Sequence, residues 1–352
     1  MTTATQERYS LVGPEAARAV EAGLSGVKWF RSQVPRKRMK ELMRRSDQPA
    51  IRDTAIWLGG MAAGAAGGIA LWGSPWAIPC FAVHGVLYGS ASDSRWHETQ
   101  HGTAFANRKI NDAVYQLASF FMMRDPVVWR WSHTRHHTDT LIVGRDPEIV
   151  AMRPARLARI LGNFFGLVDV PNALRDMVVH ASGRLNEEEE TFIPETERAK
   201  VHRTARIWLG IYAATGATAV ATGSILPLMV IGGPRLYGAT MHLVYGLTQH
   251  AGLGENVLDH RLNTRTVKMN RINRFLYWNM NYHVEHHMFP MVPYHRLPEL
   301  HAEIAHDLAE PYPSIWAAYK ELVPAVLRQL NDQSYYVRRE LPAGATPYNE
   351  EA

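Results

Sequence analysis

Uncharged, apolar residues are gathered into two pairs of long runs. The first pair covers residues 54–72 and 76–92, and the second covers residues 207–231 and 236–248. As helices rising about 1.5 Å per residue, runs of this length approach the roughly 30 Å thickness of a bilayer's hydrocarbon core. Because only the short turns G-S-P and T-G-S break these stretches, the sequence predicts four transmembrane helices in two hairpins, about 54–72 with 74–92 and about 205–222 with 225–247. Buried helices of a soluble protein are the alternative interpretation.

Charge distribution predicts how such hairpins would be oriented. Eight Arg or Lys residues fall between Arg31 and Arg52, directly before the first run. The positive-inside rule assigns this side to the cytoplasm, and two hairpins would leave every long polar segment there. The expected fold is therefore an all-α integral membrane protein, with four transmembrane helices capped by a cytoplasmic helical domain.

This interpretation divides the chain into six parts. They are an N-terminal interfacial part (1–52), a first hairpin (53–92), a polar part (93–204), a second hairpin (205–247), a second polar part (248–335) and a tail (336–352). The single cysteine, Cys80, excludes disulfides within the chain and a cysteine-based metal site. We find no nucleic-acid-binding motif, and attraction to anionic lipid explains the basic residues near the first hairpin.

Histidines are clustered at a spacing typical of metal ligands. The chain has 17 of them. Three clusters are H-E-T-Q-H (His97, His101), H-T-R-H-H (His133, His136, His137) and H-V-E-H-H (His283, His286, His287). On a helix, residues three and four apart share a face, so each cluster would present its imidazoles in one direction.

A further histidine, His250, directly follows the fourth apolar run. All nine residues can then converge just outside the same end of the predicted bundle. One zinc ion takes about four ligands, so nine imidazoles indicate two metal ions with four or five nitrogens each. Imidazole suits iron, zinc, copper and nickel, so ligand type alone does not select the metal.

These residues resemble the membrane fatty acid desaturase/hydroxylase superfamily, whose members carry three histidine boxes. The D-P-E element at residues 146–148 and the passage H-H-M-F-P-M-V-P-Y-H-R-L-P at residues 286–298 are similar to the sequences that follow the second and third boxes. The first box and the T-Q-H at residues 248–250 resemble bacterial hydrocarbon oxygenases of the rhizopine-catabolism type. That branch implies a bacterial inner membrane location with the site facing the cytoplasm.

The resemblance implies two non-haem irons held by the boxes, with His250 as an extra ligand. Some members place a water-holding asparagine four residues before that histidine, where this chain has Gly246. Either water or a neighbour such as Asn281 would then complete the shell of one iron. Carboxylates beside the boxes are expected to orient the imidazoles through their second ring nitrogen. The candidates for these supporting roles are Asp93, Asp139, Asp146, Asn281 and Glu285.

The implied activity is O2-dependent oxidation of an unactivated C–H bond in a lipid or alkyl substrate. Hydroxylation or oxidative demethylation of a small methylated molecule is the alternative within the superfamily. The chain has no G-x-G-x-x-G fingerprint and no cysteine cluster, so we expect a separate electron donor, a ferredoxin with its reductase. Arg124, Arg130 and Arg135 could receive an acidic donor, and contact with phospholipid is the alternative role for them.

Two functions from other classes also use clustered histidines. A membrane hydrolase would hold zinc and activate water, and a metal transporter would pass ions between histidines inside its helices. The predicted spans contain only His84 and His242, which disfavours transport. Metal content separates the oxygenase from the zinc enzyme.

Overall fold

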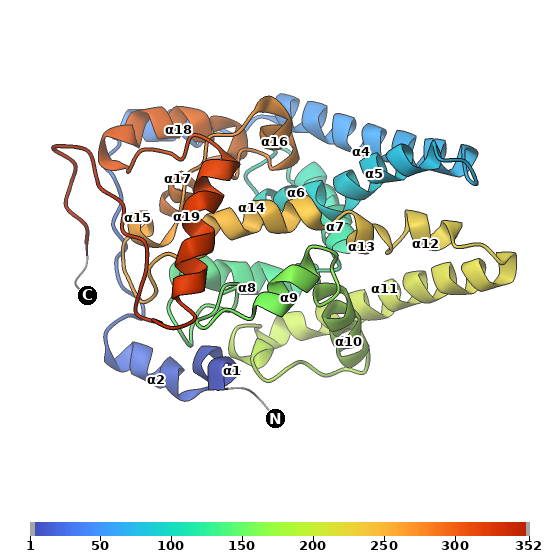
Figure 1. The fold of residues 1–352 in the computed structure, drawn as a ribbon, viewed down its shortest axis with the longest axis horizontal. Coiled ribbons are helices and arrows are strands. Elements are labelled where there is room, and N and C mark those ends of the chain that lie inside the picture. Colours follow the sequence, from blue (N-terminus) through green and yellow to red (C-terminus); the bar gives the residue numbers. More distant parts are fainter. Residues whose placement is uncertain (1–3, 350–352) are drawn as a thin grey trace.

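A computed structural model describes residues 4–349 as a helical protein (Figure 1). Within that range there is no β-strand, only isolated bridges joining Thr266 to Tyr282 and Val267 to Tyr312. The α-helices are α1 (Ala4–Tyr9), α2 (Pro14–Glu21), α3 (Arg36–Leu42), α4 (Asp47–Ala70), α5 (Ala77–Gly89), α6 (Ala91–Gln100), α7 (Arg108–Met122), α8 (Pro126–Thr138), α9 (Leu157–Asn163), α10 (Asp169–Ala181), α11 (Glu195–Thr222), α12 (Leu226–Val230), α13 (Pro234–Tyr237), α14 (Thr240–His250), α15 (His260–Asn263), α16 (Arg271–Leu276), α17 (His283–Met288), α18 (Leu297–Ile304) and α19 (Ile315–Arg328).

The predicted membrane spans are not reproduced. Among residues 4–349, no helix combines the length and the apolar character needed to cross a membrane. The second predicted span forms only the 13 residues of α5. The fourth is divided among α12, α13 and α14, because Gly233 and Pro234 interrupt it.

The two longer helices also differ from the prediction. Helix α4 has 24 residues, but five of the residues from Gly59 onward are glycines without an apolar side chain. Helix α11 has 28 residues, and its first four turns carry six charged side chains. The expectation of four transmembrane helices, and of an integral membrane location, is therefore wrong.

Helices α4 and α5 nevertheless pack together closely, as a predicted hairpin would. A Cβ atom at Gly64 would lie 2.9 Å from the carbonyl oxygen of Cys80 on α5, so the two backbones meet at a position that only glycine fits. His84 adds polar contacts, because its Nδ1 lies 3.0 Å from the Met61 oxygen and its Nε2 lies 3.1 Å from the Val230 oxygen. This histidine therefore joins α4, α5 and α12 and has a packing role.

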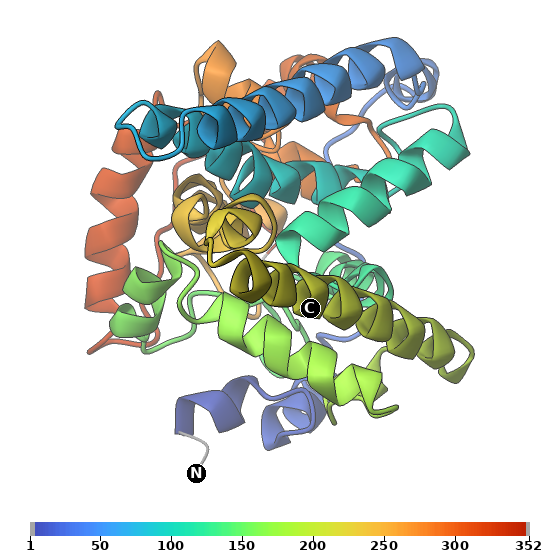
Figure 2. The same ribbon diagram turned by 90° about the vertical axis from the view of Figure 1, so that its right-hand side faces the viewer.

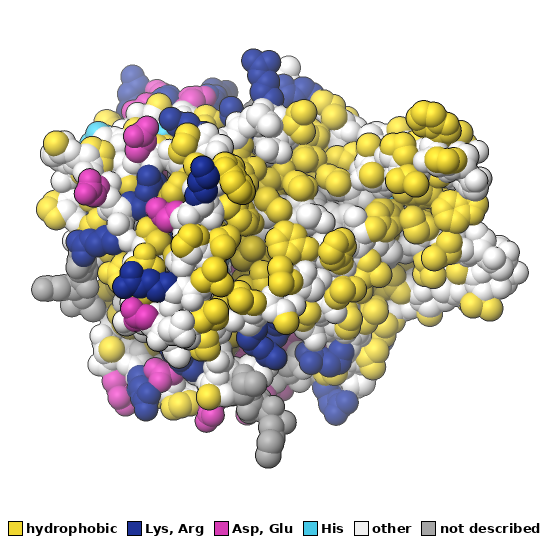
Figure 3. All heavy atoms as spheres, in the orientation of Figure 1, with side chains coloured by type: hydrophobic (Ala, Val, Ile, Leu, Met, Phe, Trp, Pro, Cys, Tyr) yellow, Lys and Arg dark blue, Asp and Glu magenta, His cyan; other side chains and the backbone are white. Residues whose placement is uncertain are grey.

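Apolar side chains remain exposed at one end of the molecule. Hydrophobic residues dominate the right-hand end in Figure 3, where Figure 1 places α4, α5, α11 and α12. Trp76 and Ile78 are each 71% exposed, and Val220 is 84% exposed. Charged side chains gather toward the opposite end. The segregation seen in the sequence is thus reproduced in space.

The largest hydrophobic core lies among the segments that carry the histidines. It includes Trp57 of α4, Trp96 of α6, Tyr245 of α14 and Met288 of α17, each at most 2% exposed. Helix α14 runs through the middle of the molecule between the α4–α5 pair and α11 (Figures 1 and 2). Packing around α14 therefore determines where the histidine segments meet.

Candidate metal centre

Four helices bring the nine predicted histidines to one place. Helix α6 and its C-cap carry the first box, α8 the second and α17 the third, and His250 is the last residue of α14. The ring nitrogens form two groups that could each hold a metal ion, with all donor atoms of a group within 4.8 Å of one another. The first group is His97, His101, His133, His137 and His286, and the second is His136, His250 and His287.

Nε2 atoms in the first group face one another at short distances. His97 Nε2 lies 2.9 Å from His286 Nε2, and His286 Nε2 lies 3.2 Å from His137 Nε2. His137 and His133 are 3.0 Å apart at the same atoms. Nitrogens that converge in this way surround a point from several sides, as the ligands of a metal ion do.

His283 lies beside two members of the second group. Its Nε2 lies 3.2 Å from the Nε2 atoms of both His250 and His287. The structure therefore brings together all nine predicted ligands, in one set of five and one of four. Each set has enough nitrogen donors to hold a metal ion.

Local sequence explains how α8 and α17 present their histidines. Asp125 caps α8 by accepting hydrogen bonds from the amides of Val127 and Val128, and Pro126 occupies the first helical position. Before α17, Trp278 and Asn279 adopt the left-handed conformation, with φ values of 44° and 56°. These turns start each short helix so that the i, i+3 and i+4 positions face the centre.

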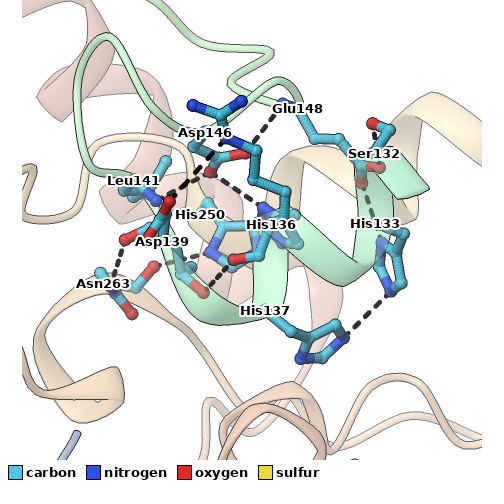
Figure 4. A network of polar contacts seen from close by, with 12 residues as sticks. Ser132, His133, His136, His137, Asp139, Leu141, Asp146, Glu148, His250 and Asn263 are labelled. Atoms are coloured by element: carbon cyan, nitrogen blue, oxygen red, sulfur yellow. Dashed lines mark hydrogen bonds and ion pairs between the residues drawn. The ribbon is translucent and has the colours of Figure 1, made fainter. Parts of the chain in front are cut away.

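Two carboxylates hold histidines of the second box (Figure 4). His136 Nδ1 lies 2.9 Å from Asp146 Oδ2, and His133 Nδ1 lies 2.9 Å from Glu148 Oε2. The same Asp146 oxygen also accepts from the Leu141 amide at 2.8 Å. When Nδ1–H donates to a carboxylate, the Nε2 lone pair is left free to bind a metal.

Other histidines are oriented by neutral groups. His250 Nδ1 lies 2.8 Å from the Asn263 carbonyl oxygen, and His287 Nδ1 lies 3.2 Å from the Thr140 hydroxyl. Each contact again leaves Nε2 directed at the cluster. The contacts of Glu148, Thr140 and Asn263 with the histidines were not predicted, although Glu148 belongs to the D-P-E element quoted above.

Most of the other predicted supporting residues lie away from the imidazoles. Asp139 pairs with Arg145 at 2.9 Å, and Glu285 binds Thr266 and His301. Asn281 donates to the Val267 oxygen at 2.8 Å, which stabilises the turn before α17. Asp93 pairs with Arg124 at 2.5 Å. Of the predicted carboxylates, only Asp146 contacts a box histidine in the structure.

Burial keeps most of the clustered imidazoles neutral. It lowers the pKa of His101 and of His250 to about 3, and it lowers those of His97, His133 and His286 well below the usual range, with further reduction from neighbouring imidazoles. The pKa of His136 is raised instead, because Asp146 outweighs the effect of burial. A neutral imidazole is the form that binds a metal ion.

A cavity of about 430 Å³ reaches the histidines from one side. Residues of α6, α8, α10 and α14 line it, including His97, His133, His136, His250 and His283. Its volume is within the range of about 300–1,000 Å³ found for small-molecule sites. A molecule in this cavity would contact the candidate metal centre directly.

Comparison with known proteins agrees with this arrangement. Residues 71–319 match the sequence model of the fatty acid desaturase family. The chain belongs to the fatty acid desaturase family. The Delta(5) fatty acid desaturase fat-4 of Caenorhabditis elegans is 26% identical to it over 228 residues, which cover 57% of this chain and 51% of the relative. The chain thus spans about half the length of that relative.

The matched residues 71–319 include all nine clustered histidines. The histidine groups suit a resident metal, because they supply neutral, converging nitrogen donors and no thiolate. The buried Nε2 of His101 also lacks any hydrogen-bond partner among the described residues, whereas the unpartnered nitrogens of His137, His283 and His286 are Nδ1 atoms on the side of the ring away from the cluster. Unpartnered buried nitrogens are costly, and a bound metal would satisfy those that face the cluster.

Proposed function

We propose that this desaturase-family protein binds two irons at the nine-histidine centre and uses O2 to oxidise an unactivated C–H bond in a lipid or alkyl substrate. The observation that carries the proposal is the pair of converging imidazole groups beside a cavity. Iron bound at these groups would supply O2 activation and the oxidising power needed to remove hydrogen from carbon. Family membership supports this reaction class.

The chain's own residues orient the ligands and exclude water. Asp146 and Glu148 hold the Nδ1 atoms of His136 and His133, so that the ring planes and tautomers are set before metal binds. His97 and His286 are at most 6% exposed. A site that is shielded from bulk water protects a reactive oxidant from side reactions.

Small displacements of the substrate would decide the product. Loss of hydrogen from two adjacent carbons gives a desaturated product, whereas transfer of oxygen gives an alcohol. Hydroxylation of a methyl group can lead to its loss, so demethylation of a small methylated molecule is an alternative outcome of the same C–H oxidation. Mass spectrometry of lipids and small metabolites from cells with and without the gene separates these outcomes.

Metal content and turnover test the proposal together. We expect about two irons per purified chain and O2 consumption that depends on a reductant. His286→Ala should abolish turnover, because Nε2 of this residue lies within 3.2 Å of ring nitrogens from both the first and the second box. His306→Ala, at a side chain that is 63% exposed, serves as the control. A single tightly held zinc, or an active His286→Ala variant, would contradict the proposal.

A separate ferredoxin with its reductase remains the proposed electron source. Of the three arginines expected to dock it, only Arg130 is exposed. Arg124 is held by Asp93 at 2.5 Å, and Arg135 donates to Thr191 at 2.8 Å. We therefore expect Arg130→Glu to lower kcat/KM for the ferredoxin, and more so at low salt. Unchanged kinetics with the donor would exclude this face of α8 as the docking site.

A further inference from the structure

Residues 346–349 bind the buried arginine of the short helix α15, at the left-hand side of Figure 1. A guanidinium carries five N–H donors, and each donor of Arg261 has an acceptor. Asp259 accepts from Nε at 2.9 Å and from Nη2 at 2.6 Å, and the Asp307 carbonyl oxygen accepts from Nη1 at 3.1 Å. The carbonyl oxygens of the segment's first two residues accept the remaining two hydrogen bonds, at 2.9 and 3.0 Å.

The same segment binds the carboxylate that starts α15. Asp259 caps the helix, because its Oδ1 accepts from the Arg261 amide at 2.9 Å. Its Oδ2 accepts from the Asn349 amide at 3.1 Å. The side chains of Asp259 and Arg261 are at most 1% exposed. Without residues 346–349 this buried ion pair would lose three hydrogen bonds, and unsatisfied buried polar groups are costly.

Arg261 also contacts two aromatic rings. Its guanidinium carbon lies 3.6 Å from the ring centroid of Phe30 and 5.2 Å from that of Tyr348. The Phe30 amide donates to the Leu258 oxygen at 3.2 Å, just before α15. A helix of only four residues is not stable by itself, so the position of α15 depends on contacts of this kind.

Helix α15 in turn orients histidines of the second group. The Asn263 carbonyl oxygen accepts from His250 Nδ1 at 2.8 Å. Asn263 also donates to the Thr140 carbonyl oxygen at 3.1 Å, and the Thr140 hydroxyl lies 3.2 Å from His287 Nδ1. The ring centroid of His260 is 5.0 Å from that of His287. Two of the three histidines whose nitrogens form the second group are thus positioned from α15.

Other residues hold the first group. Glu148 contacts His133 at Nδ1 and accepts from the Ser132 hydroxyl at 2.8 Å. These three residues belong to α8 and the loop that follows it, so their contacts do not pass through α15. A disturbance at residues 346–349 should therefore reach the second group and spare the first.

We propose that residues 346–349 are a positioning element of the second metal site. They fix the Asp259–Arg261 pair, and through α15 they direct the Nε2 atoms of His250 and His287. The inference rests on metal binding at the histidine centre, which is part of the proposed function. Residues that orient metal-bound histidines typically contribute about 10- to 100-fold to metal affinity. Loss of the segment's contacts should accordingly weaken one of the two metal sites.

Release of cobalt(II) tests this selectivity. Cobalt(II) binds imidazole, and its visible absorption reports its ligands. The intact protein is loaded with cobalt(II) and mixed with an excess of chelator, and His101→Ala and His250→Ala assign the release phases of the first and second groups. The double variant Tyr348→Ala, Asn349→Pro removes the ring beside Arg261 and the amide donor to Asp259. It should speed release from the second group about tenfold or more and leave release from the first within about twofold.

Tyr348→Phe is the matched control. It keeps the ring beside Arg261 and loses only the hydroxyl, which donates to the Arg339 oxygen at 2.5 Å. Its release kinetics should equal those of the wild type. Unchanged release from the second group in the double variant, or equal acceleration at both groups, would overturn the proposal.

Hydrogen exchange of the metal-free protein tests the same coupling without a metal. Amides of residues 257–264 should exchange faster in the double variant than in Tyr348→Phe, whereas those of α6, which carries His97, should not change. Equal exchange of residues 257–264 in the two variants would refute the coupling.

Failure of this inference and failure of the proposed function are distinguishable. A wild-type protein that binds no cobalt(II) would contradict the metal centre of the proposed function, and hydrogen exchange would still decide whether residues 346–349 position α15. Cobalt(II) bound at both groups and released from the double variant at wild-type rates would contradict the positioning role alone.

Discussion

At the scale of single residues, the centre depends on which ring nitrogen each histidine leaves free. Asp146, Glu148 and the Asn263 carbonyl each lie within 2.9 Å of an Nδ1 atom. Nε2 is then the atom directed into the cluster. The same chain places other carboxylates nearby, such as Asp139, that contact arginines instead. This difference offers a direct test of the orienting role.

Asp146→Asn should lower metal affinity about 10- to 100-fold, because asparagine accepts the His136 proton less strongly and disturbs the contact with the Leu141 amide. Competition with a chromogenic chelator measures the change. Asp139→Asn breaks an ion pair with Arg145 without touching a histidine, so its metal affinity should stay near that of the wild type. Equal losses of metal affinity in the two variants would mean that the loss does not come from the contact between Asp146 and His136.

At the scale of helices, two features control how the histidine segments are placed. Asp125 starts α8, and Gly238 lets the segment before α14 lie against α5. A Cβ atom at Gly238 would collide with the Gly85 carbonyl group. Neither residue is among the predicted ligands, yet each holds a ligand-bearing helix in position.

Gly238→Ala should therefore destabilise the protein by about 1–3 kcal/mol, since neither backbone can move without disturbing the packing of α5. Chemical denaturation monitored by circular dichroism measures this. Gly210→Ala, on an exposed face of α11 where a Cβ meets nothing within 4 Å, is the matched control. It should be neutral or stabilising by about 0.5–1 kcal/mol. If both substitutions changed the free energy of unfolding in the same direction, the close contact between Gly238 and Gly85 would be ruled out as the cause.

Asp125→Asn should change how stability depends on pH. Burial raises the pKa of Asp125 to about 6, although the Val128 and Val127 amides oppose this shift. The unfolded value is about 3.9, so the wild type loses stability as the pH rises from about 4 to about 6. Asparagine caps helices equally well and does not titrate. As the pH rises through this window, the free energy of unfolding of the variant should increase relative to that of the wild type. A difference between the two proteins that does not depend on pH would contradict the raised pKa of Asp125.

At the scale of the whole molecule, the two histidine groups link segments far apart in sequence. Residues from 97 to 287 meet at one centre. Metal ions bound there would join α6, α8, α14 and α17 and oppose their separation on unfolding.

Metal removal should accordingly lower the melting temperature. A ligand at about 100 times its Kd stabilises the folded state by about 2.7 kcal/mol. Differential scanning calorimetry before and after chelation, followed by return of iron, measures the effect. A protein with His133 and His286 of the first group and His250 and His287 of the second group all changed to Ala should show no response to iron. Stabilisation of that variant would place the metal elsewhere.

The candidate ligands were predictable because their signal is local. H-x-x-H-H on a helix puts three imidazoles on adjoining faces whatever surrounds them. The residues that orient them were only partly predictable. Asp146 lies ten residues after His136, but the partner of His250 is a backbone carbonyl, at Asn263, which no side-chain pattern reveals.

The membrane spans were mispredicted because the uncharged runs were assumed to form helices long and apolar enough to cross a membrane. The glycines of α4 leave it with fewer apolar side chains, and the break at Gly233 and Pro234 divides the fourth predicted span into short helices. The role of Gly238 could not be predicted from its neighbours in sequence, because it depends on a contact with Gly85, which is 153 residues earlier. Local composition does not encode such contacts.

The sequence alone determined the desaturase family, the nine histidines and their grouping into helical clusters, since each depends on neighbours within a few positions. Only the tertiary structure decided how the histidines divide into two groups and which carboxylates hold them. These properties arise from distances between segments far apart in the chain. Such distances depend on how all the helices pack at once.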